Sequence, residues 1–347
     1  MKRSHAVMTE SQQIEALHES AVLLDQLPLE LIRATGADRA AFLHRLLSGN
    51  VAGTKPGFGC HALLLDTKGH VQSDMEIYVS PDHVRIVTAA GQGTATVAAL
   101  SRYAIMDDFS ASVWEGQAAL ALLGPAADST LAAAGVSVPA PVASGAPRQH
   151  ADEGTDASGL WIIRTHALGQ TGFQLWGPKT RLAALVEQLR GMGIPGLTPG
   201  TAEALRIVAG EPRFGLDITP DRFPMELGLD DAIDYSKGCY LGQEPIVRIR
   251  DRGHVNWGLR RLRFEAGAPP PSPGDKLETD ARPSAGHITS VGFLPQRAGA
   301  PPAAVALALV HNSVAEGSLR VVSAHGVLPA QVLSLKPASV LDSNARD

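Results

Sequence analysis

The sequence has little of several features that mark particular protein classes. Cysteine occurs only twice in 347 residues, at Cys60 and Cys239, which excludes a disulfide framework, and no Cys/His spacing suggests structural zinc. No uninterrupted apolar run reaches the about 18 residues that a membrane helix needs. Basic residues are not in excess, because the net charge is −5. The composition therefore gives no overall footprint for nucleic acid.

These absences favour a protein of a reducing compartment. Residues 1–13 are polar and lack the apolar stretch of a secretory signal. The isoelectric point near 6.2 is typical of cytoplasmic proteins. We therefore expect a cytoplasmic protein with no metal site and no membrane association, and the chain is long enough for two domains with separate cores.

Two stretches of the chain repeat a similar order of strands and helices. In the first, the patterns predict strands at 29–34, 63–66, 71–79 and 84–88, and helices at 38–47 and 94–103. In the second, they predict strands at 118–123, 160–166 and 172–176, and helices that begin at Gly124-Pro125, Gly177-Pro178 and Thr198-Pro199. Residues 136–159 are rich in Ala, Pro, Ser and Gly, which predicts a flexible insertion.

A proline-rich segment at residues 266–274 predicts a stiff linker. Short strand-like pieces follow it, at 286–293, 304–310, 319–322 and 331–335. The predicted organisation is a disordered N-terminus (1–14), an α+β domain of two similar halves (15–265), the linker, a small β-barrel (275–340) and a tail (341–347).

The densest group of chemically versatile side chains is the motif Lys237–Glu244, which reads Lys-Gly-Cys-Tyr-Leu-Gly-Gln-Glu. Gly238 and Gly242 allow the backbone to turn sharply around Cys239 and Tyr240. A nearby lysine favours an accessible, activated thiol, so Cys239 and Lys237 are candidate catalytic residues. Tyr240, Gln243 and Glu244 are expected to support the loop. The alternatives are a structural thiol and a helix-flanking charge, and for Cys60 the structural role is preferred.

The motif, continued by Pro245 to Arg248, resembles the signature of the YgfZ-type folate-binding proteins, which are involved in iron–sulfur protein assembly or repair. These proteins belong to the glycine-cleavage T-protein superfamily, and residues 31–50, 205–219 and 286–290 resemble other parts of it. The resemblance implies a three-lobed ring, in which two pseudo-repeated subdomains of antiparallel sheet and helices surround a central folate pocket beside a C-terminal β-barrel. It also implies tetrahydrofolate as the cofactor, and iron–sulfur proteins or assembly factors as partners.

Five residues are candidates for folate binding: Asp74, Gln170, Arg206, Tyr240 and Arg248. The carboxamide of Gln170 stands where T-proteins carry a glutamate for the pterin edge, and Ser73-Asp74 replaces an acidic pair. These departures argue against true aminomethyl transfer more than against folate binding. Arg206 lies among apolar residues, so a buried ion pair competes with binding of a folate carboxylate.

Arginines crowd residues 248–263, and on a strand Arg248, Arg250 and Arg252 would share one face. Such a face is either solvated or binds an anion such as the folate tail, nucleic acid or an acidic partner. The favoured hypothesis is a tetrahydrofolate-binding protein that supports iron–sulfur cluster assembly or repair, with folate-coupled thiol chemistry at Cys239. The alternatives are an aminomethyltransferase-like one-carbon transferase and a non-enzymatic scaffold or RNA-modification-associated protein regulated by folate. The sequence leaves open whether the chain is an enzyme.

Overall fold

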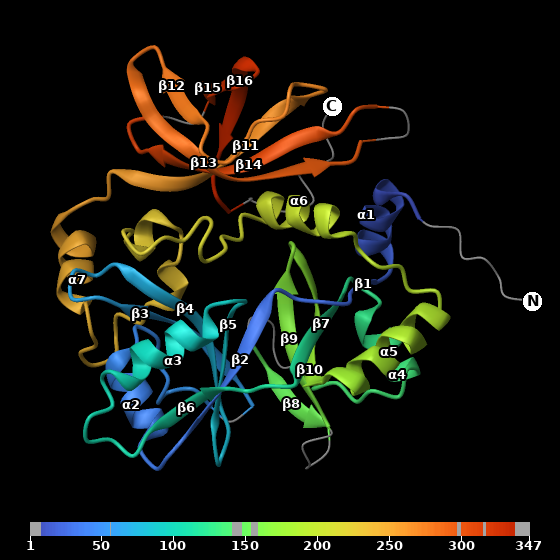
Figure 1. The fold of residues 1–347 in the computed structure, drawn as a ribbon, viewed down its shortest axis with the longest axis vertical. Helices are drawn as coiled ribbons and strands as arrows, with labels where there is room; N and C mark the ends of the chain where they lie inside the picture. The colour runs from blue at the N-terminus through green and yellow to red at the C-terminus, as the bar shows by residue number, and fades with distance from the viewer. Residues whose placement is uncertain are drawn as a thin grey trace, which may run out of the picture.

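The structure, a computed structural model, describes residues 8–55, 57–140, 148–153, 159–296, 300–314 and 317–336. Two five-stranded antiparallel sheets lie side by side beneath a closed six-stranded barrel (Figure 1). This is the α+β architecture that the sequence predicts, with two similar halves and a C-terminal barrel. Within the described part of the chain, no helix is both long and apolar enough to cross a membrane.

The first sheet has the strand order β3-β4-β5-β2-β6. Its strands are β2 (Leu29–Thr35), β3 (Gly59–Leu65), β4 (Val71–Val79), β5 (Val84–Ala89) and β6 (Ser110–Val113). Helices α2 (Arg39–Leu46) and α3 (Gly93–Ser101) cover its outer face (Figure 1). Phe42 and Leu43 of α2 pack there against Ile32 and Met75 of the sheet, which is the helical face that the apolar spacing predicts.

The second sheet has the order β1-β7-β10-β9-β8. Its strands are β1 (Val22–Leu24), β7 (Gln117–Leu123), β8 (His150–Glu153), β9 (Leu160–Ala167) and β10 (Gln170–Pro178). Helices α4 (Ala127–Ala133) and α5 (Lys179–Gly191) cover its outer face (Figure 1).

Two local predictions for this half are wrong. Strand β8 falls inside the predicted insertion, because His150 to Glu153 pair with β9 and the carboxylate of Asp152 binds Arg85 of the other sheet at 2.7 Å. The N-terminus is helical from Glu10 as α1 (Glu10–Glu19), where Thr9 and Gln12 form a capping box. Residues 141–147, 154–158 and 1–7 lie outside the described residues.

The inner faces of the two sheets meet in an aromatic layer. Tyr78 of β4 contacts Trp161 of β9 edge to face, with 4.9 Å between the ring centroids. Trp161 and Trp176 are buried, and the guanidinium of Arg85 lies 4.7 Å from the Trp161 ring. Such aromatic and cation–π contacts add to the energy of apolar burial. They hold the two halves together, so side chains further along the inner faces keep fixed positions.

Helix α6 (Pro199–Ala209) lies between the barrel and the sheets (Figure 1). It begins at the predicted Thr198-Pro199 and ends at Gly210, whose φ is 70°. A Cβ at Gly210 would lie 1.9 Å from the carbonyl oxygen of Leu335, so this contact requires glycine. Two 3₁₀ turns, η1 (Pro224–Glu226) and η2 (Asp230–Ala232), and helix α7 (Gln243–Arg252) follow.

The barrel closes in the order β11-β14-β13-β12-β15-β16. Its strands are β11 (Trp257–Ala266), β12 (Lys276–Thr279), β13 (Arg282–Leu294), β14 (Ala303–His311), β15 (Gly317–Ser323) and β16 (Gly326–Leu333). The proline-rich segment at 266–274 therefore connects two strands of one barrel and does not separate two domains as expected. Strand β11 was missed as a barrel strand because its partners, β14 and β16, lie more than 30 residues away in sequence.

Candidate functional site

The Lys237–Glu244 motif forms a loop that leads into α7. Gly242 precedes the helix with a φ of 78°. A Cβ on this residue would lie 2.3 Å from the carbonyl oxygen of Asp66, which belongs to the turn between β3 and β4. The loop therefore packs on the β3–β4 hairpin at a distance that only glycine allows. Cys239 is exposed in this loop.

Lys237 anchors the loop instead of facing solvent. Its ammonium donates to the carbonyl oxygens of His44, Leu47 and Gly49, the last at 2.9 Å. His44 and Leu47 lie at the C-terminal end of α2, where carbonyl groups lack helical partners. Burial lowers the pKa of Lys237 to about 8. Because these three contacts use all of its donors, the lysine fixes the position of Cys239 through the backbone.

Tyr240 is the apolar anchor of the loop. Its side chain is buried against Leu65 and Ile246. Its hydroxyl is buried with no hydrogen-bond partner among the described residues, and burial raises its pKa to about 12. Gly238 is exposed, with open space around its Cα. Tyr240 therefore packs the loop against the core, while Gly238 and Cys239 remain accessible.

The β3–β4 hairpin under this loop carries a charged group on its inner face. His61 of β3 contacts Asp74 of β4, with 2.5 Å between Nε2 and Oδ1. Its other nitrogen, Nδ1, lies 3.5 Å from Oδ2 of Asp231 in η2. Despite burial, the two carboxylates raise the pKa of His61 to about 10, and the same contact lowers the pKa of Asp231 to about 2. His61 is therefore a cation that joins the hairpin to the segment before the motif.

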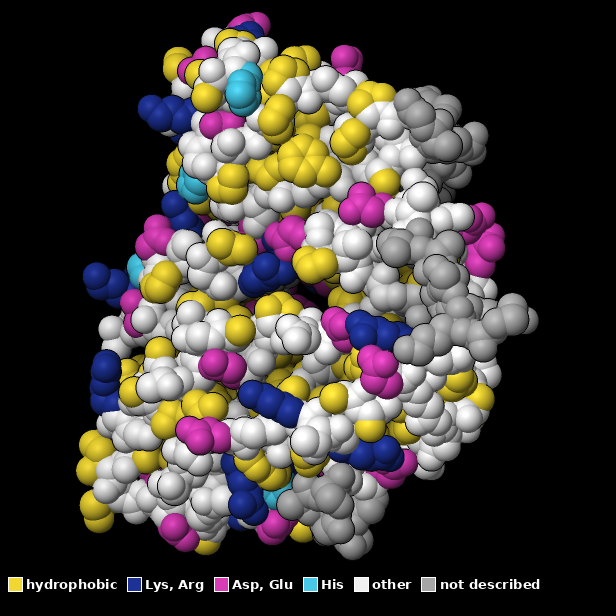
Figure 2. All heavy atoms as spheres, turned by 45° about the vertical axis from the view of Figure 1, so that its right-hand side comes forward, with side chains coloured by type: hydrophobic (Ala, Val, Ile, Leu, Met, Phe, Trp, Pro, Cys, Tyr) yellow, Lys and Arg dark blue, Asp and Glu magenta, His cyan; other side chains and the backbone are white. Residues whose placement is uncertain are grey.

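A second ion pair adjoins this group. Nε of Arg148 lies 3.0 Å from Oε1 of Glu76, and the Tyr78 hydroxyl donates to Oε2 at 2.7 Å. Glu76 pairs with His61 across the two strands, so both side chains share the inner face. Asp74, His61 and Arg148 remain 23%, 12% and 22% exposed. They are thus partly accessible. On the face of the molecule drawn in Figure 2, charged side chains surround a hollow at mid-height.

We expect the His61 group to make stability depend on pH. Its folded pKa of about 10 exceeds the ordinary value of 6.5, so its contribution is complete below pH 6.5 and is lost as pH rises through about 10. Between pH 7 and 10, the free energy of unfolding of the wild type should fall by about 3–4 kcal/mol more than that of His61→Gln. Urea unfolding of both proteins across this range measures the difference. Parallel pH curves would contradict the assignment.

Gln170 lies at the start of β10, next to an unusual turn. Its amide nitrogen lies 2.9 Å from Nδ1 of His18 in α1. The preceding Leu168 and Gly169 have φ values of 53° and 74°, and the Gly169 amide donates to Glu211. Burial raises the pKa of Glu211 to about 7. Gln170 therefore lies at an internal contact between α1 and the second sheet. The carboxylate of Glu211 lies beside its turn and is not predicted from the sequence.

Arg206 takes part in a buried ion pair. Its Nη1 lies 2.8 Å from Oδ2 of Asp217, and its Nη2 lies 2.6 Å from Oε1 of Glu203. Asp217 also accepts from Thr289 and Ser290 of the barrel. Of the two roles weighed for Arg206, this is the structural one. The carboxylates of Asp217 and Glu203 already neutralise its charge. Through Asp217, Arg206 links α6 to the following loop and to the barrel.

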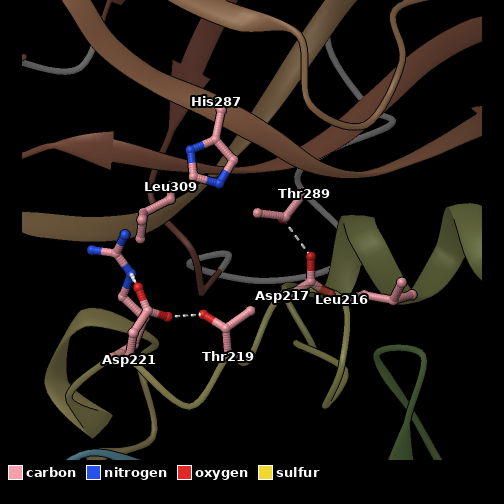
Figure 3. A pocket seen from close by; sticks show the side chains of 8 residues that line it. Leu216, Asp217, Thr219, Asp221, His287, Thr289 and Leu309 are labelled. Carbon is pink, nitrogen blue, oxygen red and sulfur yellow. Dashed lines mark hydrogen bonds and ion pairs between the residues drawn. The ribbon is translucent and has the colours of Figure 1, made fainter.

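A cavity of about 240 Å³ lies where this loop meets the barrel, and its lining includes Asp217, Thr219, Asp221, His287 and Thr289 (Figure 3). Its polar groups already bind one another, since Thr289 donates to Asp217 and Thr219 donates to Asp221. A smaller cavity of about 50 Å³ lies among Arg85, Trp114, Trp161 and Trp176. Neither cavity is lined by a residue predicted from sequence to be functional.

The predicted stripe of arginines does not exist as one surface. Arg248, Arg250 and Arg252 lie on helix α7 and not on a strand, because Ile246 is buried in the core and Pro245 is tolerated in the first turn of a helix. Arg248 is 72% exposed and pairs with Glu244 at 2.7 Å. In β11, Arg261 is buried and donates to the carbonyl oxygens of Ser334 and Val208. The arrangement gives no continuous basic face for nucleic acid.

Asp74 is predicted from the sequence, but the residues around it are not. His61 contacts Asp74 from the neighbouring strand, and Glu76 lies two residues further along β4. Asp231, which contacts His61, and Arg148, which contacts Glu76, come from distant parts of the chain. A histidine at an inward position of a strand that also holds Leu63 and Leu65 is a signal that could have been used. Among the described residues, no group of His, Cys, Asp or Glu has the arrangement of a metal site.

Comparison with known proteins identifies the family. The GCVT N-terminal domain family matches residues 3–237, more than half of the chain. The sequence is 26% identical over 334 residues to the aminomethyltransferase of Frankia alni, covering 94% of this chain and 87% of that protein. It is 28% identical over 288 residues to the mitochondrial aminomethyltransferase of Flaveria trinervia, covering 75% of this chain but only 65% of the relative.

A comparison with solved structures agrees with this family. The glycine cleavage system aminomethyltransferase T of Bartonella henselae superposes with a TM-score of 0.81 at 25% identity, covering 94% of this chain and 88% of that structure. The chain therefore belongs to the GCVT N-terminal domain family and has an aminomethyltransferase-like fold.

Proposed function

We propose that the protein binds tetrahydrofolate between its two sheets and supports the assembly or repair of iron–sulfur proteins, with Cys239 as the reactive thiol. One observation carries the proposal. The loop that exposes Cys239 packs on the hairpin that carries Asp74 and His61, with Gly242 against Asp66. A ligand bound at the inner face of that hairpin can therefore affect the position of the thiol.

The chemistry of the inner face supports a pterin. A pterin is a flat ring whose guanidine-like edge binds a carboxylate through two hydrogen bonds. Oδ1 of Asp74 accepts from His61, whereas Oδ2 accepts no hydrogen bond from the described residues. Arg148 is a nearby cation suited to an anionic tail. Under this proposal, Asp74 and Arg148 bind folate, while Arg206 is a structural residue.

The iron–sulfur role rests on the motif at Lys237–Glu244 and its resemblance to the YgfZ-type proteins. Cys239 is a single exposed thiol, and clusters normally have four protein ligands. The proposal therefore gives Cys239 a transient contact with an iron–sulfur protein or assembly factor, and no resident cluster. Lys237 and Tyr240 support this contact by fixing both sides of Gly238 and Cys239.

One-carbon transfer is the second candidate, because the relatives are aminomethyltransferases and the carboxylate of Asp74 lies at the inner face. Ser73 argues against it. Its hydroxyl lies 2.8 Å from that of Thr96 in the outer core, so it adds no second acid to the inner face. Turnover of methylene-tetrahydrofolate with an aminomethyl or methylated amine substrate would favour this candidate.

A titration with tetrahydrofolate under reducing conditions tests the proposed cofactor. We expect saturable binding by the wild type, and binding about tenfold weaker for Asp74→Asn, which loses a charge-assisted hydrogen bond. Asp280→Asn is the matched control, since Asp280 pairs with Arg320 on the barrel surface. The absence of binding by the wild type would overturn the proposal.

A further inference from the structure

We infer that His61 influences which folates the proposed site accepts, because its positive charge weakens the binding of the cationic 5,10-methenyl form relative to that of a neutral pterin. This inference rests on the folate site proposed above and concerns its ligand selectivity. It follows from the place of His61 between two carboxylates on the inner face.

The imidazole of His61 lies between two carboxylates. Asp74 contacts Nε2 at 2.5 Å, and Asp231 lies 3.5 Å from Nδ1. The Nδ1 atom is buried and has no closer partner among the described residues. A protonated imidazole satisfies this arrangement, since each nitrogen then directs a hydrogen toward an acid. Consistent with this, the pKa of His61 is raised to about 10.

The charges around His61 are closest to balance when it is protonated. Three carboxylates lie in the group: Asp74 and Glu76 on β4, and Asp231 in η2. The cations in contact with them are His61 itself and Arg148 beside Glu76. The sum is therefore −1 with a charged His61 and −2 without it. A cationic ligand is attracted less strongly to a pocket of charge −1 than to one of charge −2.

Two folates separate this effect from other contributions. 5-Formyl-tetrahydrofolate has an uncharged pterin, whereas the 5,10-methenyl form carries a positive charge delocalised over N5 and N10. Both have the same glutamate tail, so the ratio of their dissociation constants reports mainly the charge next to the ring. Mildly acidic buffer keeps the methenyl ring intact, and His61 stays protonated there.

The test is equilibrium dialysis of both folates with the wild type, His61→Gln, Asp231→Asn and the control His83→Gln, whose imidazole also pairs with an aspartate but lies at the other end of the sheet. His61→Gln should shift the ratio about tenfold toward the methenyl form. Asp231→Asn should shift it in the opposite direction, and His83→Gln should leave it unchanged.

His61→Gln and Asp231→Asn are expected to shift the ratio of dissociation constants in opposite directions. Either variant alone therefore tests the proposal if the other fails to fold, which circular dichroism would reveal. Wild-type binding of both folates with a ratio unchanged in His61→Gln, or in Asp231→Asn, would overturn the role of His61 and leave the folate site intact. If the wild type binds neither folate, the proposed site itself is wrong.

Discussion

Replacing Arg206 by methionine is expected to lower the free energy of unfolding by about 3–5 kcal/mol, because it breaks a buried ion pair. The side chain of Asp217 is fully buried and would lose its cationic partner. The backbone carbonyl of Glu211 would also lose the guanidinium that donates to it. Urea unfolding followed by circular dichroism measures the change.

Arg213→Met is the matched control. Arg213 pairs with the same Glu203, but 34% of its side chain is exposed, so its loss should cost less than about 1 kcal/mol. Equal losses for the two variants would contradict the role assigned to Arg206. An Arg206→Lys protein of normal stability that no longer bound folate would instead make Arg206 a ligand of the folate carboxylate.

Replacing Cys239 by alanine is expected to abolish the cellular function while leaving the fold and the tetrahydrofolate affinity within about twofold of the wild type. The side chain is exposed and makes no hydrogen bond among the described residues, so its loss costs little stability. The measurement is the activity of an iron–sulfur enzyme in cells that carry only the variant protein.

Cys60→Ala provides the control for the thiol itself. Cys60 packs against the outer core of the first sheet, and burial raises the pKa of its thiol, so it is a poor nucleophile. Cells with this variant should retain the iron–sulfur enzyme activity. If cells with Cys239→Ala keep full iron–sulfur enzyme activity, the thiol has no part in the function. That result would favour a scaffold in which folate is only a regulatory ligand.

Most of the fold could be predicted because local patterns and long-range packing agree. In β4, buried and exposed residues largely alternate, as expected for a strand whose two faces differ, and Thr198-Pro199 starts α6 as expected. The errors occur where tertiary contacts decide. Strand β8 exists because a sheet edge and Arg85 bind it. The arginines after the motif alternate like those of a strand, but the segment is a helix whose buried residue is Ile246.

The candidate site was harder to predict than the fold. The Cys239 loop is visible in the sequence because all of its residues are contiguous. The charged group beneath it is not, because His61 and Asp231 are separated by 170 positions and become neighbours only when η2 packs on β3. The role of Lys237 also depends on residues that are distant in sequence. Its spacing suggests an effect on Cys239, whereas its ammonium binds carbonyl groups at the end of α2.

The most direct test of the central claim is a crystal structure of the protein soaked with tetrahydrofolate. The account expects the pterin against the inner face of β3 and β4, with its guanidine-like edge at the free oxygen of Asp74 and its tail toward Arg148. Density for the ring beneath the barrel, in the cavity beside His287, would contradict it.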